Sequence, residues 1–274
     1  MRYLIVLFII LFAAEVFSQE TDSLIIKGND AMYNKNDKLA AEYFNEYLKR
    51  NPDDKSAYVS LGAAFINLKK YSDAYNCFDK AVKLDSSYAR AYSSRGACYM
   101  LFNDYESAKK DLFKSLELDP NDALTYNSLA TLFATQGDSV TAYAYYDKAA
   151  EVNPEYLETY WNRGAYYFNR DNFPKAFEDV NKAIEINPKI AKSFYFRGTL
   201  YKYTNQYEKA MEDFNTAIRL EPNNAEAYVR RGILYLATGK YREAVEDMEY
   251  GYVLDPGLKE QTENYYKEAK EKNK

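Results

Sequence analysis

The chain has 274 residues and a net charge of −5, and 47% of its residues are hydrophobic, which excludes a wholly disordered chain. Nucleic acid is not an expected partner, because its phosphates require patches of Lys and Arg, and the chain has 36 of these against 41 Asp and Glu with no basic run. The absence of His excludes His-based catalytic triads, His general bases and His-ligated metal sites.

The N-terminus carries a short apolar run, Tyr3 to Ala14, preceded by Arg2. A membrane-spanning helix needs about 20 apolar residues, and this run is shorter. One positive charge, a short apolar core and a following polar stretch predict a secretory signal peptide over residues 1–18, cleaved after Ser18. An uncleaved anchor is the alternative. We expect an exported protein, periplasmic or secreted, with no stable membrane insertion after cleavage.

A period of 34 residues runs through the rest of the chain. Its most regular mark is an alanine that recurs without exception at Ala40, Ala74, Ala108, Ala142, Ala176, Ala210 and Ala244. Glycines keep the same step from Gly28 to Gly232, with Ala130 in one place, and prolines keep it from Pro52 to Pro256, with Ser86 in one place. The register defines seven repeats, at residues 21–54, 55–88, 89–122, 123–156, 157–190, 191–224 and 225–258.

Within each repeat the apolar spacing is helical. In the sixth repeat, residues three and four apart predict two helix faces, one with Phe194, Gly198 and Tyr201, the other with Tyr207, Ala210, Phe214 and Ala217. A turn at Asn205–Gln206 separates them, and Pro222 ends the second. In the fifth repeat, Pro174 stands where the second helix should begin, a position that accepts proline.

These motifs resemble the tetratricopeptide repeat: aromatic–x2–Arg/Leu–Gly–x2–Tyr, then Tyr–x2–Ala–x3–Phe–x2–Ala–x4–Pro. The resemblance implies an all-α fold, a right-handed α-solenoid or superhelix of seven helix–turn–helix hairpins over residues 19–258. Residues 259–274 are charged with one apolar face and predict a C-terminal capping helix. The first repeat departs from the pattern at Leu24, Ala31, Asp37 and Tyr47, as terminal repeats do when one face meets solvent.

Four repeats combine Arg at position 7 with Asp at position 23, and the other three lack both. We infer an ion pair between the two helices of each such hairpin: Arg95 with Asp111, Arg163 with Asp179, Arg197 with Asp213, and Arg231 with Asp247. The alternative is that these arginines form a row that binds an anionic ligand.

The two cysteines, Cys77 and Cys98, fall on helices that are neighbours in a stacked array. In an exported protein an even number of cysteines permits a disulfide. Two buried thiols packed as small apolar side chains are the other interpretation.

The resemblance also implies a ligand surface, at positions 2, 5, 9, 12 and 13 of each first helix. Repeats two to four offer mainly small or polar side chains there, whereas repeats five and six offer aromatics, amides and lysines. The residues predicted to bind an extended peptide are Asn127, Trp161, Phe168, Asn169, Lys192, Tyr195, Lys202 and Tyr203. Lateral packing of these rings is the alternative. Asn162, Lys192 and Lys202 are only fragments of the carboxylate clamp of chaperone-binding members.

The sequence therefore predicts a non-enzymatic scaffold or adaptor of the cell envelope, with a protein or peptide partner and no cofactor. It has no nucleophile elbow, no glycine-rich phosphate loop and no metal-ligand constellation. A glycan- or envelope-polymer-binding module that stacks sugars on Trp161, Tyr195 and Tyr203 is the alternative. A regulatory partner of a membrane complex, with no small ligand, is a third.

Overall fold

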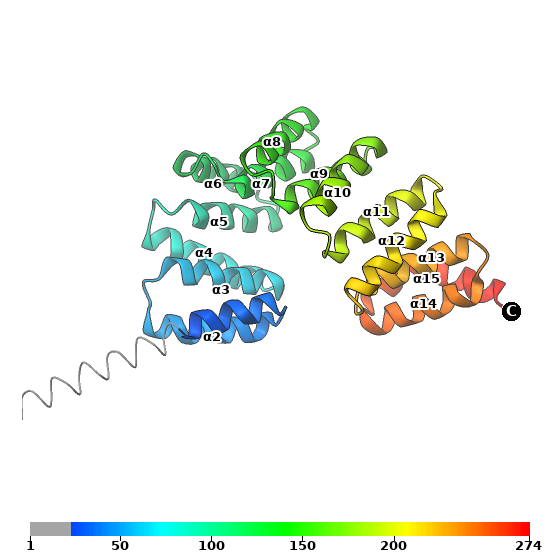
Figure 1. Cartoon of the computed structure of the whole chain (residues 1–274). Helices are drawn as coiled ribbons and strands as arrows, with labels where there is room; N and C mark the ends of the chain where they lie inside the picture. Colours follow the sequence, from blue (N-terminus) through cyan, green and yellow to red (C-terminus); the bar gives the residue numbers. More distant parts are fainter. Residues whose placement is uncertain (1–22) are drawn as a thin grey trace, which may run out of the picture. The chain divides into compact units, whose positions relative to one another are not determined.

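The computed structural model describes residues 23–274, and every regular element in that range is a helix. The predicted signal peptide and its cleavage point lie outside the described residues. Residues 23–33 form the first helix of repeat one, and the helices that follow pair into hairpins (Figure 1). The described residues are thus an all-α repeat solenoid, as the sequence predicts.

The chain divides into two compact parts, each with its own hairpins. After residues 23–33, the N-terminal part contains α2 (Asp37–Arg50), α3 (Lys55–Asn67), α4 (Tyr71–Leu84), α5 (Ala89–Leu101), α6 (Tyr105–Leu118), α7 (Ala123–Thr135) and α8 (Ser139–Val152). The C-terminal part contains α9 (Leu157–Phe168), α10 (Phe173–Ile186), α11 (Ala191–Tyr203), α12 (Tyr207–Leu220), α13 (Ala225–Ala237), α14 (Tyr241–Leu254) and α15 (Gly257–Lys272). From the second repeat on, first helices begin at position 1 and second helices at position 17.

The turn inside each hairpin has the same backbone conformation. Position 15 has a positive φ in all seven repeats: Lys35, Lys69, Asn103, Gly137, Asp171, Asn205 and Gly239. The amide of the next residue donates to a carbonyl five residues earlier, as in Lys70 N to Phe65 O at 2.8 Å. This is the Schellman ending of a helix, which usually favours glycine. Only two of the seven positions are glycine, so the hairpin imposes the left-handed conformation on five side chains.

The glycines of the period lie where the two helices of a hairpin touch. A Cβ added to Gly62 would lie 2.4 Å from Cε1 of Phe78, and one added to Gly198 would lie 2.9 Å from Cε1 of Phe214. The alanines of the period, Ala74 and Ala210 among them, are fully buried. Small residues thus let the helices approach, and the rings fill the remaining space.

All four predicted Arg–Asp pairs are present. Arg95 Nε donates to Asp111 Oδ2 at 2.7 Å. The other three pairs have shortest nitrogen-to-oxygen distances of 2.6, 2.8 and 2.7 Å, in the order Arg163–Asp179, Arg197–Asp213 and Arg231–Asp247.

Three of these arginines also bond to the preceding repeat, which the sequence analysis missed. The third nitrogen of each guanidinium donates to position 25 of that repeat: Arg95 to Asp79 at 2.8 Å, Arg197 to Asn181 at 2.9 Å and Arg231 to Asn215 at 2.7 Å. Each arginine therefore joins its own two helices and also joins two successive repeats.

The disulfide interpretation of Cys77 and Cys98 is wrong in this structure, because both are free thiols. Cys77 packs with Leu61 and Tyr58, and Cys98 packs in a separate cluster around Phe78 and Val59. Both are buried, and burial raises the pKa of each thiol to about 12. They pack as small apolar residues, which is the other interpretation that the sequence left open.

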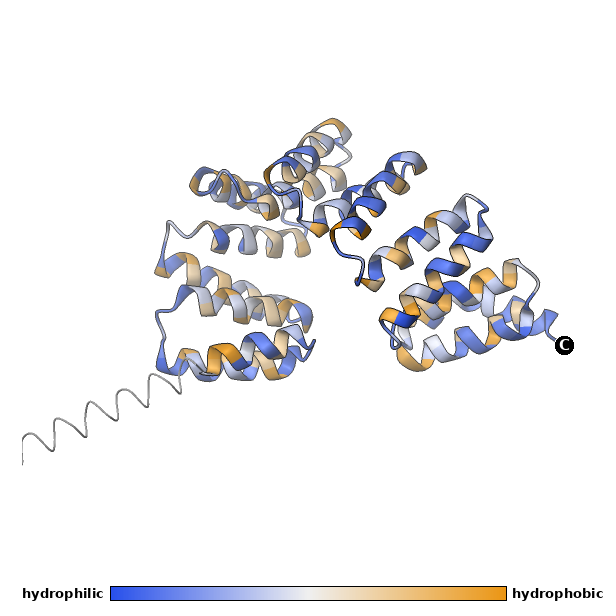
Figure 2. Ribbon diagram, viewed as in Figure 1, coloured by the Kyte–Doolittle hydropathy of each residue, from blue (hydrophilic) through white to orange (hydrophobic). Residues whose placement is uncertain are grey.

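The last helix, α15, packs on α13 and α14 as the predicted cap. Ala269 is fully buried against them, and the Tyr252 and Thr262 hydroxyls lie 2.9 Å apart. Most of its residues are hydrophilic (Figure 2). Within residues 23–274, no helix has the length and apolar character needed to cross a bilayer.

Candidate functional site

Seven of the eight residues predicted to bind a peptide lie in the C-terminal part. Trp161 and Phe168 belong to α9, Asn169 caps its end, and the other four belong to α11. The eighth, Asn127, lies on α7 in the N-terminal part, where it is 6% exposed. Its Oδ1 accepts no hydrogen bond within the described part of the chain. Seven of these residues therefore belong to one compact part of the chain, on or next to α9 and α11, and Asn127 belongs to the other.

The indole of Trp161 is held on both its edge and its face. Its Nε1 donates to the buried Ser193 Oγ at 2.9 Å, which ties α9 to α11. Lys192 Nζ lies 4.2 Å from the ring centroid, a cation–π contact. One face of the ring is thus covered by a lysine of the next repeat.

A second aromatic contact joins the ends of the same two helices. The rings of Phe168 and Tyr203 meet edge to face with centroids 4.9 Å apart. Tyr203 is 53% exposed, and Lys202 Nζ lies 5.1 Å from its ring centroid. Asn169, at the exposed end of α9, donates its backbone N–H to Ala165 O. This end of the surface offers an open ring and an ammonium group to a ligand.

Arg230 of α13 completes this surface, and the sequence analysis missed it. It interacts with the phenol groups of Tyr195 and Tyr203. Burial raises the pKa of Tyr195; Glu226 adds to the rise and Arg230 opposes it. Arg230 occupies position 6, outside the positions 2, 5, 9, 12 and 13 that the sequence resemblance implies. We call Trp161, Phe168, Lys192, Tyr195, Lys202, Tyr203 and Arg230 the aromatic–cationic face.

Its three cations lack close counterions. Within the described residues, no carboxylate oxygen lies within 4 Å of Lys192, Lys202 or Arg230. Burial lowers the pKa of Lys192, although Glu158 and Glu226 oppose this from a greater distance. Burial also lowers the pKa of Lys202, and Arg230 lowers it further. Several lysines on second helices, by contrast, form ion pairs, as Lys182 does with Glu185 at 2.9 Å.

A pocket of about 490 Å³ opens beside Lys202, between α11, α13 and α15. Ile233, Leu236 and Ala237 of α13 form an apolar wall, and Tyr241, Tyr265, Glu268 and Lys272 line the remainder. Ile233, Leu236 and Ala237 are positions 9, 12 and 13 of the seventh repeat, so this pocket extends the aromatic–cationic face.

The first helices of the N-terminal part form a different surface. A pocket of about 380 Å³ lies over α3, α5 and α7. The small and polar residues expected there, such as Ala63, Ser93 and Ala97, do line it. Ile66 and Leu101 add larger apolar side chains, and Leu101 is 47% exposed. This surface offers apolar contact and hydroxyl groups, with no charged side chain among its lining residues.

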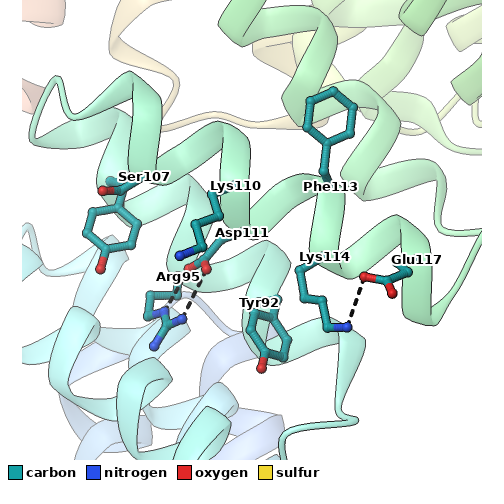
Figure 3. A pocket seen from close by; sticks show the side chains of 9 residues that line it. Tyr92, Arg95, Ser107, Lys110, Asp111, Phe113, Lys114 and Glu117 are labelled. Atoms are coloured by element: carbon teal, nitrogen blue, oxygen red, sulfur yellow. Dashed lines mark hydrogen bonds and ion pairs between the residues drawn. The ribbon is translucent and has the colours of Figure 1, made fainter.

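A larger pocket, of about 710 Å³, lies on the α5–α6 hairpin (Figure 3). Four of its five charged lining residues are already paired, and Lys110 is the exception. Arg95 is bonded to Asp111 and Asp79, and Lys114 Nζ lies 2.9 Å from Glu117 Oε2. The pocket thus surrounds the structural ion pair of repeat three and offers a ligand little unpaired charge. Within residues 23–274, no cluster of Cys, Asp and Glu is arranged to hold a metal ion.

Comparison with known families gives five matching models. Four are described as tetratricopeptide repeat, over residues 27–75, 89–122, 112–144 and 157–190, and one as TPR repeat, over residues 198–239. No curated protein sequence matches the chain.

Solved structures show the same fold at low identity. Yeast Tom70 matches with a TM-score of 0.71 at 22% identity, over 93% of this chain and 65% of its own. A chain of the APC/C hetero-tetramer Cut9–Hcn1 matches with 0.69 at 17% identity, over 92% of this chain and 46% of its own. A tetratricopeptide repeat protein from Parabacteroides merdae ATCC 43184 matches with 0.62 at 20% identity, over 92% and 99%. This chain therefore spans less than two thirds of the first two relatives and nearly all of the third.

Proposed function

The chain belongs to the tetratricopeptide repeat family, and we propose that it is a non-enzymatic scaffold of the cell envelope that holds an extended segment of a partner protein on the aromatic–cationic face. The family generally supplies protein-binding scaffolds rather than catalysts. The observation that carries the proposal is that Lys202 and Arg230, neither of which has a carboxylate within 4 Å, lie beside the exposed ring of Tyr203.

The chemistry of this face suits a peptide. Aromatic rings supply large contact area at little entropic cost, and Tyr and Arg are frequent among the residues that dominate protein interfaces. Phe168 and Tyr203 are fixed against each other, so Tyr203 does not have to be ordered when a ligand arrives. Lysines without a close counterion can form ion pairs with carboxylates of a partner.

The envelope setting rests on the apolar run of residues 3–14 behind Arg2. Export and removal of residues 1–18 would give a mature chain that begins at Gln19. N-terminal sequencing of the protein purified from its source cells, after cell fractionation, tests this step separately. A cytoplasmic protein that retains Met1 would contradict export and leave the binding proposal intact.

A photo-crosslink tests the binding face directly. Benzoylphenylalanine in place of Tyr203 should yield a discrete crosslinked partner in cells. The same replacement at Tyr250 is the matched control, because Tyr250 is 45% exposed on the second helix α14. Equal crosslinking at both positions, or none at Tyr203, would overturn the proposal for this face.

The glycan alternative is less well supported by the geometry. A sugar-stacking platform needs an open ring face, and Lys192 covers one face of Trp161 while Ser193 holds its nitrogen. A glycan-binding module should lose binding chiefly on Trp161→Ala and be insensitive to salt. A peptide-binding module should lose it on Lys192→Ala and weaken as salt is added.

A further inference from the structure

The pocket beside Lys202 is not formed by the repeats alone. Ile233 and Leu236 come from the seventh repeat, but Tyr265, Glu268 and Lys272 come from α15, which lies outside the repeats. Tyr265 is 43% exposed on this helix, facing the pocket rather than buried in the core below it. The terminal helix therefore contributes a wall of the cavity in addition to capping the array.

The charge in this pocket is unbalanced. Lys272 Nζ lies 2.7 Å from Glu268 Oε1, so these two side chains compensate each other. Lys202 is then left with no carboxylate within 4 Å, and another cation, Arg230, is close enough to lower its pKa. Lys202 is partly desolvated and is repelled by Arg230, and both effects disfavour its charged form in the unliganded protein. An anion placed between them would relieve both effects.

Apolar walls and unpaired cations together specify the ligand. Ile233 and Leu236 suit an aliphatic or aromatic side chain, whereas Lys202 and Arg230 suit carboxylates beside it. The volume, about 490 Å³, lies within the roughly 300–1,000 Å³ common for ligand pockets. We propose that this pocket takes an apolar side chain of an acidic partner segment whose carboxylates pair with Lys202 and Arg230, so that α15 is part of the binding site. This inference rests on the proposed function and names its partner chemistry.

An anionic membrane surface is the other source of negative charge. It would require a broad field of cations, whereas this pocket has one lysine without a close carboxylate, Lys202, with Arg230 nearby, beside an apolar wall in a chain of net charge −5. A single acidic segment fits the local character of the charge better.

Selection from a random peptide library tests the inference without a known partner. Residues 19–274 would be used as bait, followed by affinity measurements on a synthetic peptide of the selected consensus. We expect enrichment of Asp and Glu next to Leu, Ile or Phe, and binding that weakens as salt rises. Lys202→Met and Tyr265→Ala should each reduce affinity about tenfold or more, as loss of one partner of a buried charge pair or of a central aromatic does.

Lys209→Met is the matched control, because Lys209 is an exposed lysine on the second helix α12, and it should leave affinity unchanged. Urea denaturation of each variant separates a lost contact from a lost fold. Selected peptides without acidic enrichment that still depend on Tyr203 would overturn this inference and leave the proposed function standing. Recovery of no peptide at all would count against both.

Two further results would overturn it. Selected peptides whose affinity is unaffected by Tyr265→Ala would remove α15 from the site. Binding to phosphatidylglycerol vesicles that is lost in Lys202→Met, without binding to acidic peptides, would assign the cations to a membrane surface instead.

Discussion

The guanidinium of Arg197 holds the carboxylate of Asp213 with two parallel hydrogen bonds, Nε to Oδ2 and Nη2 to Oδ1, both 2.8 Å long. Asp213 is 5% exposed, so removing the arginine leaves a buried carboxylate without its partner. Such losses cost about 3–5 kcal/mol, whereas replacing the whole pair by packed side chains costs far less. We expect Arg197→Leu to lower the urea midpoint more than the double change Arg197→Leu, Asp213→Tyr.

The double change copies repeat four, where Leu129 and Tyr145 occupy these positions. Arg242→Leu serves as the control, because the Arg242–Glu246 pair is exposed to solvent and should hardly shift the midpoint. Equal midpoints for the single and double variants of Arg197 would mean that the pair does not hold the hairpin together.

A second prediction concerns the helix contact at Gly62. The added methyl of Gly62→Ala would lie 2.4 Å from Cε1 of Phe78, so the ring must move within a packed core. Overpacking of this kind costs about 1–3 kcal/mol. Gly96→Ala is a milder control, since its Cβ would lie 3.0 Å from Leu112 Cγ. In a double-mutant cycle measured by urea denaturation, Gly62→Ala should cost less stability in a Phe78→Leu background than in the wild-type chain. If the free-energy changes of the two substitutions were strictly additive, the clash between the added methyl and the Phe78 ring would be contradicted.

The period of 34 residues was enough to predict the hairpins, because the small residues and prolines mark where helices touch and end. Pro174 does stand in the first turn of α10. The left-handed turn residues were not predictable from composition. Lys35 and Lys69 are not residues that usually signal a positive φ, and their conformation comes from the closure of the hairpin.

The second partner of each arginine could have been found in the sequence. Asp79, Asp147, Asn181 and Asn215 are hydrogen-bond acceptors at position 25 of the repeats before the four arginines, and Phe113 stands there before Leu129, although Asn45 stands there before Leu61. Arg230 could not be found this way, because only the packing of α13 beside α11 brings it near Tyr195 and Tyr203.

The buried thiols predict a loss of stability at high pH. The pKa of Cys98 is raised to about 12 in the folded chain, whereas an exposed thiol titrates near 8.5. Between these values the unfolded chain has lost a proton that the folded chain keeps, so stability falls as pH rises from about 9 towards 12. Cys98→Ala should flatten this part of the dependence of urea midpoint on pH. In native protein at pH 8, Ellman's reagent should react slowly with both thiols, and rapidly once urea unfolds the chain; fast reaction in the native state would refute their burial.

The packing of α15 against the last repeat gives a final prediction. Ala269 is fully buried in the cluster of Ile233, Leu236 and Met248. Ala269→Glu would force a carboxylate into this apolar contact or detach the helix, and either outcome should cost more than about 2 kcal/mol. Gln261→Glu introduces the same charge at an exposed position of α15 and should leave the urea midpoint nearly unchanged. Because α15 also forms a wall of the pocket beside Lys202, Ala269→Glu should weaken binding of an acidic peptide as well. If both the stability and the peptide binding of this variant were unchanged, α15 would neither cap the array nor belong to the site.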